Sequence, residues 1–175
     1  MQMKITNKCK EVLNQMRDSY ASELEALYPA LKESKDKGDL SENAEYTLLK
    51  EQVDALSVKL EVVELMLVQP TASASGNVVR EGKVIRITEV TNYEDEPSLT
   101  QGDTQYSVQD SLYFNRDLLV SEITIALDCR DMLLNHNVIS PHASIISSVM
   151  GKPPGEYEVR VNPQLTRKLR YEIVG

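Results

Sequence analysis

Residues 46–67 read YTLLKEQVDALSVKLEVVELML, and this stretch decides the architecture of the N-terminal part of the chain. Apolar side chains recur along it at alternating steps of three and four residues, at Tyr46, Leu49, Val53, Leu56, Leu60, Val63 and Leu67. Such spacing lines up one side of an α-helix and is typical of the seam of a coiled coil. With its flanking residues the stretch predicts a helix of about 27 residues, which is roughly 40 Å long at 1.5 Å per residue.

A second helical pattern precedes this one and runs from Thr6, a suitable N-cap, to about Lys35. Its apolar and aromatic positions also recur at steps of three and four, at Leu13, Met16, Tyr20, Leu24, Leu27 and Leu31. Pro29 lies inside the pattern, where a proline removes a backbone hydrogen bond at a cost of about 3 kcal/mol, so we expect a kink or a local break. A turn at Lys37–Gly38 joins the two helices, which predicts an antiparallel hairpin with its turn at the far end.

The periodicity changes after residues 69–76, QPTASASG, whose small, turn-favouring side chains predict a linker. Beyond the linker, short segments alternate apolar and polar residues or are rich in β-branched and aromatic side chains, which favours strands. These segments are 83–90, 104–109, 122–127, 156–161 and 168–174, and residues 143–150 predict a short helix. The chain is therefore expected to be α+β, with a helical hairpin at 1–75 and a mostly antiparallel sheet domain with a helix packed on it at 76–175.

Charge and composition narrow the function classes. The 175 residues carry a net charge of -8, and each half contributes -4, from 9 Lys and Arg against 13 Asp and Glu before residue 76 and 10 against 14 after it. Strong non-specific binding to DNA is therefore not expected. The two cysteines and two histidines form no metal-ligand motif, so we expect no metal site built from the chain alone. The absence of a signal-peptide core and of a membrane-spanning run predicts a soluble cytoplasmic protein.

The run Gly38-Asp39-Leu40-Ser41-Glu42-Asn43-Ala44-Glu45-Tyr46 connects the two helices. Asp39 is a suitable N-cap and Glu42 follows three residues later, which approximates a capping box at a helix start where acids complement the helix dipole. The same carboxylates lie at the end of a projecting rod, where they can be presented to another molecule. A cap alone does not explain why Asn43, Glu45 and Tyr46 follow in this order. Capping and a functional role are both open, and they are compatible.

The same run resembles the tip motif of the GreA and GreB transcript-cleavage factors, Gly-Asp-Leu-x-Glu-Asn-Ala-Glu-Tyr, and matches it at eight of nine positions. The similarity extends to Thr6, Glu11 and Leu13 in the first helix. It extends also to Ile139-Ser140-Pro141 and Met150-Gly151-Lys152, which are similar to the family's later SP…GK segment. The resemblance covers the whole hairpin but only patches of the C-terminal domain, and residues 92–135 depart from the family's pattern.

The resemblance implies an FKBP-like C-terminal domain that docks at the rim of the secondary channel of bacterial RNA polymerase, while the coiled coil enters the channel. Asp39 and Glu42 would then help to hold the second Mg²⁺ of the polymerase active site and orient a water that hydrolyses backtracked RNA. The chain would activate the hydrolytic activity of the polymerase and would not be an enzyme itself. Without polymerase it would bind no cofactor. Family members are usually monomers, so a monomer is expected, and the exposed heptad surface leaves self-association as the alternative.

The resemblance also implies roles for residues that flank the two acids. Asn43 and Tyr46 are weaker candidates for positioning, and Tyr46 is equally suited to packing in the seam. Glu45 could be a third acid or a solvated helix residue, and the second role is favoured. Lys35 and Lys50 correspond to basic residues thought to contact the 3′ end of the extruded RNA, and solvated surface lysines are the alternative. Lys37 could join them. Such a modest basic patch predicts behaviour nearer to GreA than to GreB.

Two other functions fit parts of the sequence. A Gre-like protein could occupy the secondary channel and regulate or inhibit transcription without stimulating cleavage, and the divergent residues 92–135 leave room for altered docking. An FKBP-like half also suggests a peptidyl-prolyl isomerase with a coiled-coil arm. That enzyme needs a deep aromatic-lined pocket, and the chain has Phe114 as its one phenylalanine and no tryptophan.

Overall fold

The computed structural model describes residues 5–37, 43–90, 112–162 and 165–175. The acids Asp39 and Glu42 and the strand expected at 104–109 therefore lie outside the described residues. The chain divides into two compact units. One unit is the hairpin, Asn7–Thr71, and the other contains Ile5, Thr6 and the described residues from Ala72 onward. The elements follow the order expected for an α+β chain, with two long helices before a five-stranded sheet, so the predicted fold class is confirmed.

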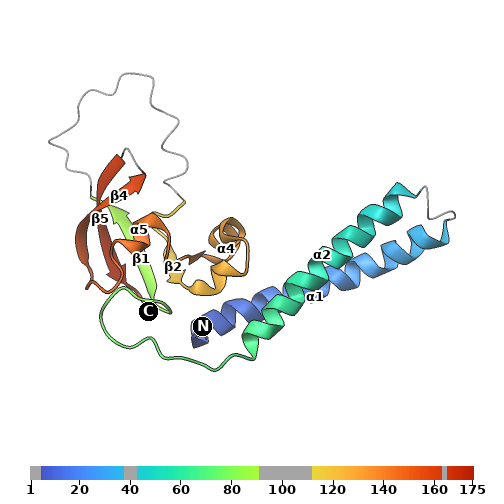
Figure 1. The fold of residues 1–175 in the computed structure, drawn as a ribbon, viewed down its shortest axis with the longest axis horizontal. Coiled ribbons are helices and arrows are strands. Elements are labelled where there is room, and N and C mark those ends of the chain that lie inside the picture. The colour runs from blue at the N-terminus through green and yellow to red at the C-terminus, as the bar shows by residue number, and fades with distance from the viewer. Residues whose placement is uncertain (1–4, 38–42, 91–111, 163–164) are drawn as a thin grey trace, which may run out of the picture. The chain divides into compact units, whose positions relative to one another are not determined.

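The hairpin consists of helix α1, Asn7–Asp36, and helix α2, Ala44–Leu67, which lie side by side (Figure 1). Thr6 directly precedes α1, in the position expected for its N-cap. Helix α1 continues through the exposed Pro29, so of the two expected outcomes the local break is wrong, and the kink stays a prediction. The missing N–H of Pro29 costs one bond in a helix of 30 residues, and packing against α2 keeps the remainder helical. No helix within the described ranges is long and apolar enough to cross a membrane.

The seam between α1 and α2 is buried as the spacing predicts. Its central cluster consists of Leu24, Val53 and Leu56, against which Tyr20, Leu27, Leu31 and Leu60 are packed. Near the end of α2 the seam shifts by one residue, because Met66 is buried while Leu67 is only partly so. An undistorted α-helix has 3.6 residues per turn, so a strict seven-residue repeat drifts slowly off the contact line.

The C-terminal unit is built on one mixed sheet of five strands in the order β3-β2-β1-β5-β4 (Figure 1). The strands are β1 Val84–Glu89, β2 Asp117–Val120, β3 Val138–Ile139, β4 Gly155–Asn162 and β5 Leu165–Ile173. Neighbouring strands are antiparallel except β2 and β3, which are parallel. The strands expected at 83–90, 156–161 and 168–174 are confirmed as β1, β4 and β5.

One face of the sheet is apolar and carries the core of this unit. Ile85 and Ile87 of β1 alternate with Arg86, and Leu169 and Tyr171 of β5 lie fully buried beside them. The short helix α5, Ser144–Ser147, confirms the helix expected at 143–150 and adds Ile145 and Ile146 to the same cluster. The Tyr171 hydroxyl donates to the Ile145 carbonyl, and burial raises the pKa of this phenol, so the group remains a neutral donor.

The strand expected at 122–127 is wrong. Residues Glu122–Ile125 form the 3-10 helix η1, because the Ser121 hydroxyl accepts from the Ile123 N–H and Thr124 donates back to the Ser121 carbonyl. These local hydrogen bonds outweigh the preference of the β-branched residues in this segment for a strand. Strand β2 and helix α4, Cys129–His136, were not expected, and α4 ends at Asn137 in the left-handed conformation.

The residues that lead into and out of the hairpin are joined within the C-terminal unit. The Ala72 N–H donates to the Ile5 carbonyl over 2.8 Å. Thr6 lies against Gly82, which has a φ of +83° and no room for a side chain, because a Cβ there would lie 2.2 Å from the Thr6 Cγ2. Gly82 is therefore required both by its backbone conformation and by the close approach of Thr6.

Substitution of Gly82 by alanine should destabilise the protein by about 2–4 kcal/mol, because it adds overpacking against Thr6 to the cost of a positive φ. Gly76 is the matched control, since it also has a positive φ, +93°, but open space around its Cβ position. Gly76→Ala should cost only about 1 kcal/mol. Urea denaturation followed by circular dichroism measures the free energy of unfolding of both variants.

Thr6→Ser removes the clashing methyl group and keeps the hydroxyl. Combined with Gly82→Ala, it should restore part of the free energy of unfolding that Gly82→Ala removes. If the effects of the two substitutions on this free energy were strictly additive, the contact between Thr6 and Gly82 would be contradicted.

Candidate functional site at the tip of the hairpin

The site suggested by the sequence lies where α1 ends and α2 begins. The described part of it consists of the last turn of α1 with Lys37, and of Asn43 with the first two turns of α2. Residues 38–42, which include Asp39 and Glu42, connect these two helix ends and lie outside the described residues.

Helix α2 is capped by Asn43, which corrects the expectation that Asp39 caps this helix. The helix begins at Ala44, and the Asn43 Oδ1 accepts from the Tyr46 N–H over 3.0 Å. Asparagine is among the strongest N-cap residues because its side-chain oxygen replaces a missing acceptor in the first turn. Glu42 therefore precedes the cap and does not occupy the third helical position. The two acids of the loop are not needed to explain how α2 starts.

The same asparagine also binds the end of α1. Its Nδ2 donates to the Ser34 carbonyl over 2.7 Å, across a separation of nine residues in the chain. Ser34 is fully buried, and its own hydroxyl donates to the Leu31 carbonyl over 2.8 Å. Its carbonyl is one of the last in α1 and lacks a helical partner in such a position. A single side chain thus satisfies one orphan group on each helix and ties the two ends together.

Ser34 was not singled out in the sequence, although a signal was present. It lies three residues after Leu31 and so continues the seam of α1 with a small polar side chain. A leucine there would occupy the space near the closing turn. The small serine leaves its backbone carbonyl accessible to Asn43.

A second connection across the hairpin is electrostatic. The Lys37 ammonium lies 3.3 Å from a Glu33 carboxylate oxygen and 3.6 Å from one of Glu45. The hydrogen bond to Glu33, followed by the charges of Glu33 and Glu45, raises the pKa of Lys37 above its usual value, so this lysine stays charged at neutral pH. Glu45 is exposed on the first turn of α2, as expected of a solvated helix residue, and it is also a partner in this surface ion pair.

The other expected site residues lie at the same end of the hairpin but are not brought together. Tyr46 is half-buried at the start of the seam, and its backbone N–H is held by Asn43. Lys35 and Lys50 are exposed, on α1 and α2 respectively, and neither forms an ion pair with another described residue. Lys37 is occupied by its two glutamates, so two free cations, and not three, flank the described tip.

Among the residues that the structure describes, no three His, Cys, Asp or Glu side chains group so as to hold a metal ion. Phe114 is half-buried and packs against the core of the C-terminal unit, as do the neighbouring Leu112 and Tyr113. It is used for packing and does not support the aromatic-lined isomerase pocket considered from the sequence.

No family model matches the chain, and no curated protein is similar to it. Among solved structures, the chain is similar to the GreA factor homolog 1 (Gfh1) protein of Thermus thermophilus and to a second structure described as the transcription factor Gfh1. Each comparison gives 16% identity and a TM-score of 0.42, and covers 100% of this chain and 100% or 99% of the other. A TM-score below 0.5 at this identity assigns neither a family nor an activity to the chain.

The double role of Asn43 can be dissected with two substitutions. Asn43→Ala removes both bonds and should destabilise the first turn of α2 by about 2 kcal/mol. Asn43→Ser keeps a side-chain oxygen that can accept from the Tyr46 N–H and loses the amide donor to the Ser34 carbonyl without placing a second acceptor against it, so its effect should be smaller. Amide hydrogen exchange of residues 43–50 measures both, with about tenfold faster exchange per 1.4 kcal/mol of lost protection. Unchanged exchange at Tyr46 in Asn43→Ala would contradict the cap.

Proposed function

We propose that the chain is a Gre-like transcription factor that enters the secondary channel of bacterial RNA polymerase and stimulates Mg²⁺-dependent cleavage of backtracked RNA. The single observation that carries this proposal is the position of the run GDLSENAEY, which joins the ends of two long helices of an antiparallel hairpin. The run resembles the tip motif of transcript-cleavage factors, and in this chain it lies where such a tip is needed.

The length of the hairpin supports the proposal. Helix α2 has 24 residues, three fewer than expected, and so extends about 36 Å at 1.5 Å per residue. A two-helix rod of this length can deliver a loop deep into a channel that a folded domain cannot enter. The seam of apolar side chains holds the two helices together in the middle of this length.

The chemistry of the two acids fits a shared metal site. Hydrolysis by two metal ions needs one ion to activate the attacking oxygen and another to stabilise the leaving oxygen. Mg²⁺ is often held in such sites by one or two carboxylates, with water and phosphate oxygens completing its shell. Asp39 and Glu42 alone would bind Mg²⁺ weakly. The protein would therefore be inert as a nuclease by itself and act only when its tip completes the site of the polymerase.

The flanking residues take different parts in this proposal. Asn43 and the Lys37–Glu45 ion pair fix the two ends of the loop, so they position the acids and do not react. Tyr46 would help to position them by packing at the start of the seam. Lys35 and Lys50 are free to attract the phosphates of the 3′ end of the RNA, and the C-terminal unit would dock at the rim of the channel.

Addition of the protein to a backtracked elongation complex with Mg²⁺ should shorten the RNA from its 3′ end. Asp39→Asn and Glu42→Gln should each slow this cleavage by about 100-fold or more, the scale on which loss of one group that stabilises transition-state charge slows a reaction. Asp54→Asn makes the same chemical change at an exposed position of α2 away from the tip, and should leave the rate unchanged.

Binding to polymerase is measured in parallel, for example by displacement of a labelled copy of the protein. Saturating binding without any stimulation of cleavage would refute the proposed activity and identify a secondary-channel regulator instead. Absence of binding would refute the choice of partner. In either case the fold-level results for Asn43 and Gly82 would be unaffected.

A further inference from the structure

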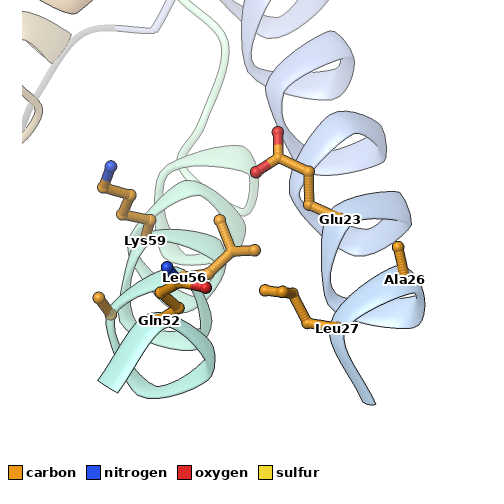
Figure 2. Close-up of a pocket in the computed structure, with 7 residues that line it drawn as sticks. Glu23, Ala26, Leu27, Gln52, Leu56 and Lys59 are labelled. Carbon is orange, nitrogen blue, oxygen red and sulfur yellow. The ribbon is translucent and has the colours of Figure 1, made fainter. Parts of the chain in front are cut away.

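Two apolar surfaces of the described hairpin are open to solvent, and the first is a groove of about 470 Å³ between α1 and α2. Leu27 and Leu56 line the groove and point toward each other from the two helices (Figure 2). Glu23 lies on the α1 side and Lys59 on the α2 side, so the charges that border the groove balance. The groove therefore does not distinguish a basic partner from an acidic one.

The second surface, which we call the outer stripe, consists of Ala55, Val58, Val62, Leu65 and Val68. These residues follow one another at steps of three or four, so they form one continuous line along the later turns of α2 and its C-cap. Val58, Leu65 and Val68 are 60%, 59% and 77% exposed. Val58 lies two residues after Leu56 of the seam, which is about 200° around the helix, so the outer stripe faces away from α1. Pairing with α1 needs only the seam, and a second exposed apolar line marks a binding surface.

The outer stripe has an acidic border. Asp54 precedes Val58 by four residues and Glu61 follows it by three, so both carboxylates lie next to Val58 on the surface of the helix. Both acids are exposed, and neither forms an ion pair with another described residue. Between residues 51 and 65, α2 carries four exposed acids against one exposed base, Lys59. This surface therefore has a net negative charge that the cations of a partner would neutralise.

The net charge decides among the kinds of partner. Nucleic acids and anionic lipid surfaces are repelled by an acidic border. A second copy of the chain would bring four more acids with its one lysine, so two outer stripes would repel each other. A cationic protein surface fits best. The spacing of three and four residues suits another α-helix, because the apolar side chains of one helix pack between those of the other.

We propose that the outer stripe docks an amphipathic α-helix of a partner protein, with lysine or arginine side chains along the edge that meets Asp54 and Glu61. The apolar face of that helix covers Val58 and Leu65, and its cations pair with the two carboxylates. The outer stripe runs from the middle of α2 to its end, so a docked helix leaves the tip of the hairpin free. The docking surface is independent of the proposed function.

Titration of the full-length, nitrogen-15-labelled protein with a synthetic peptide tests this proposal. The probe is an amphipathic peptide of leucine and lysine, about 18 residues or five helical turns long, and its matched control carries glutamate in place of lysine. The leucine–lysine peptide should bind with a dissociation constant of about 100 µM or tighter. The amide signals that shift should lie within residues 54–68. The leucine–glutamate peptide should bind at least about tenfold more weakly.

Three variants separate the apolar contribution from the charged one. Val58→Ser and Leu65→Gln each remove an apolar contact and should each weaken binding of the leucine–lysine peptide about fivefold or more. Both substitutions suit an exposed helix position, because each exchanges residues of similar helix propensity. Asp54→Asn/Glu61→Gln removes both carboxylates and should weaken binding about fivefold.

Two control variants make similar changes at exposed positions of α1. Tyr28→Ser and Glu25→Gln should leave the dissociation constant within about twofold, because neither residue belongs to the outer stripe or its border. Circular dichroism confirms that all variants remain helical. The proposal would be overturned by no binding at about 1 mM peptide. Equal binding of the two peptides, signal shifts centred outside residues 54–68, or unchanged binding in Val58→Ser and in the double charge variant would overturn it as well.

Discussion

The burial of one apolar seam between α1 and α2 is the constraint on which the hairpin depends. Two helices of this length expose mostly polar side chains, and neither would be stable alone in water without the face they share. Three buried side chains at its centre, Leu24, Val53 and Leu56, contribute on the order of 1.5–3 kcal/mol each. The packing of α1 on α2 sets their register, and the register decides which residues meet at the far end.

At that end the seam closes with a small buried residue, Ser34, and not with another leucine. The small serine leaves its own backbone carbonyl free to accept from Asn43, and Asn43 is also the N-cap of α2. One side chain therefore ends one helix, begins the next and holds them together, while Lys37 and Glu45 add a second bond on the surface.

The C-terminal unit shows where local patterns mislead. Residues 122–127 alternate like a strand, yet the Ser121 hydroxyl caps a 3-10 turn there. After the exposed Asp117, strand β2 reads LLV at 118–120, and these three residues are all buried, so the strand has no alternation to reveal it. The parallel pairing of β2 with β3 is equally invisible, because it depends on the path of the chain through α4. Strands β1, β4 and β5 were predictable since one face is apolar and the other charged.

The sequence by itself determined the two helices, the change of period after the linker, the α+β class and the position of the acidic run between helices. Each of these depends on spacing within a few residues. The tertiary structure decided that Asn43, and not Asp39, caps α2, that Glu45 pairs with Lys37, and that Glu23 and Lys59 share a groove. These outcomes depend on which residues of α1 face which residues of α2. Periodicity fixes the face of each helix, but only packing sets their relative height, because a seam of similar apolar residues can be matched in more than one register.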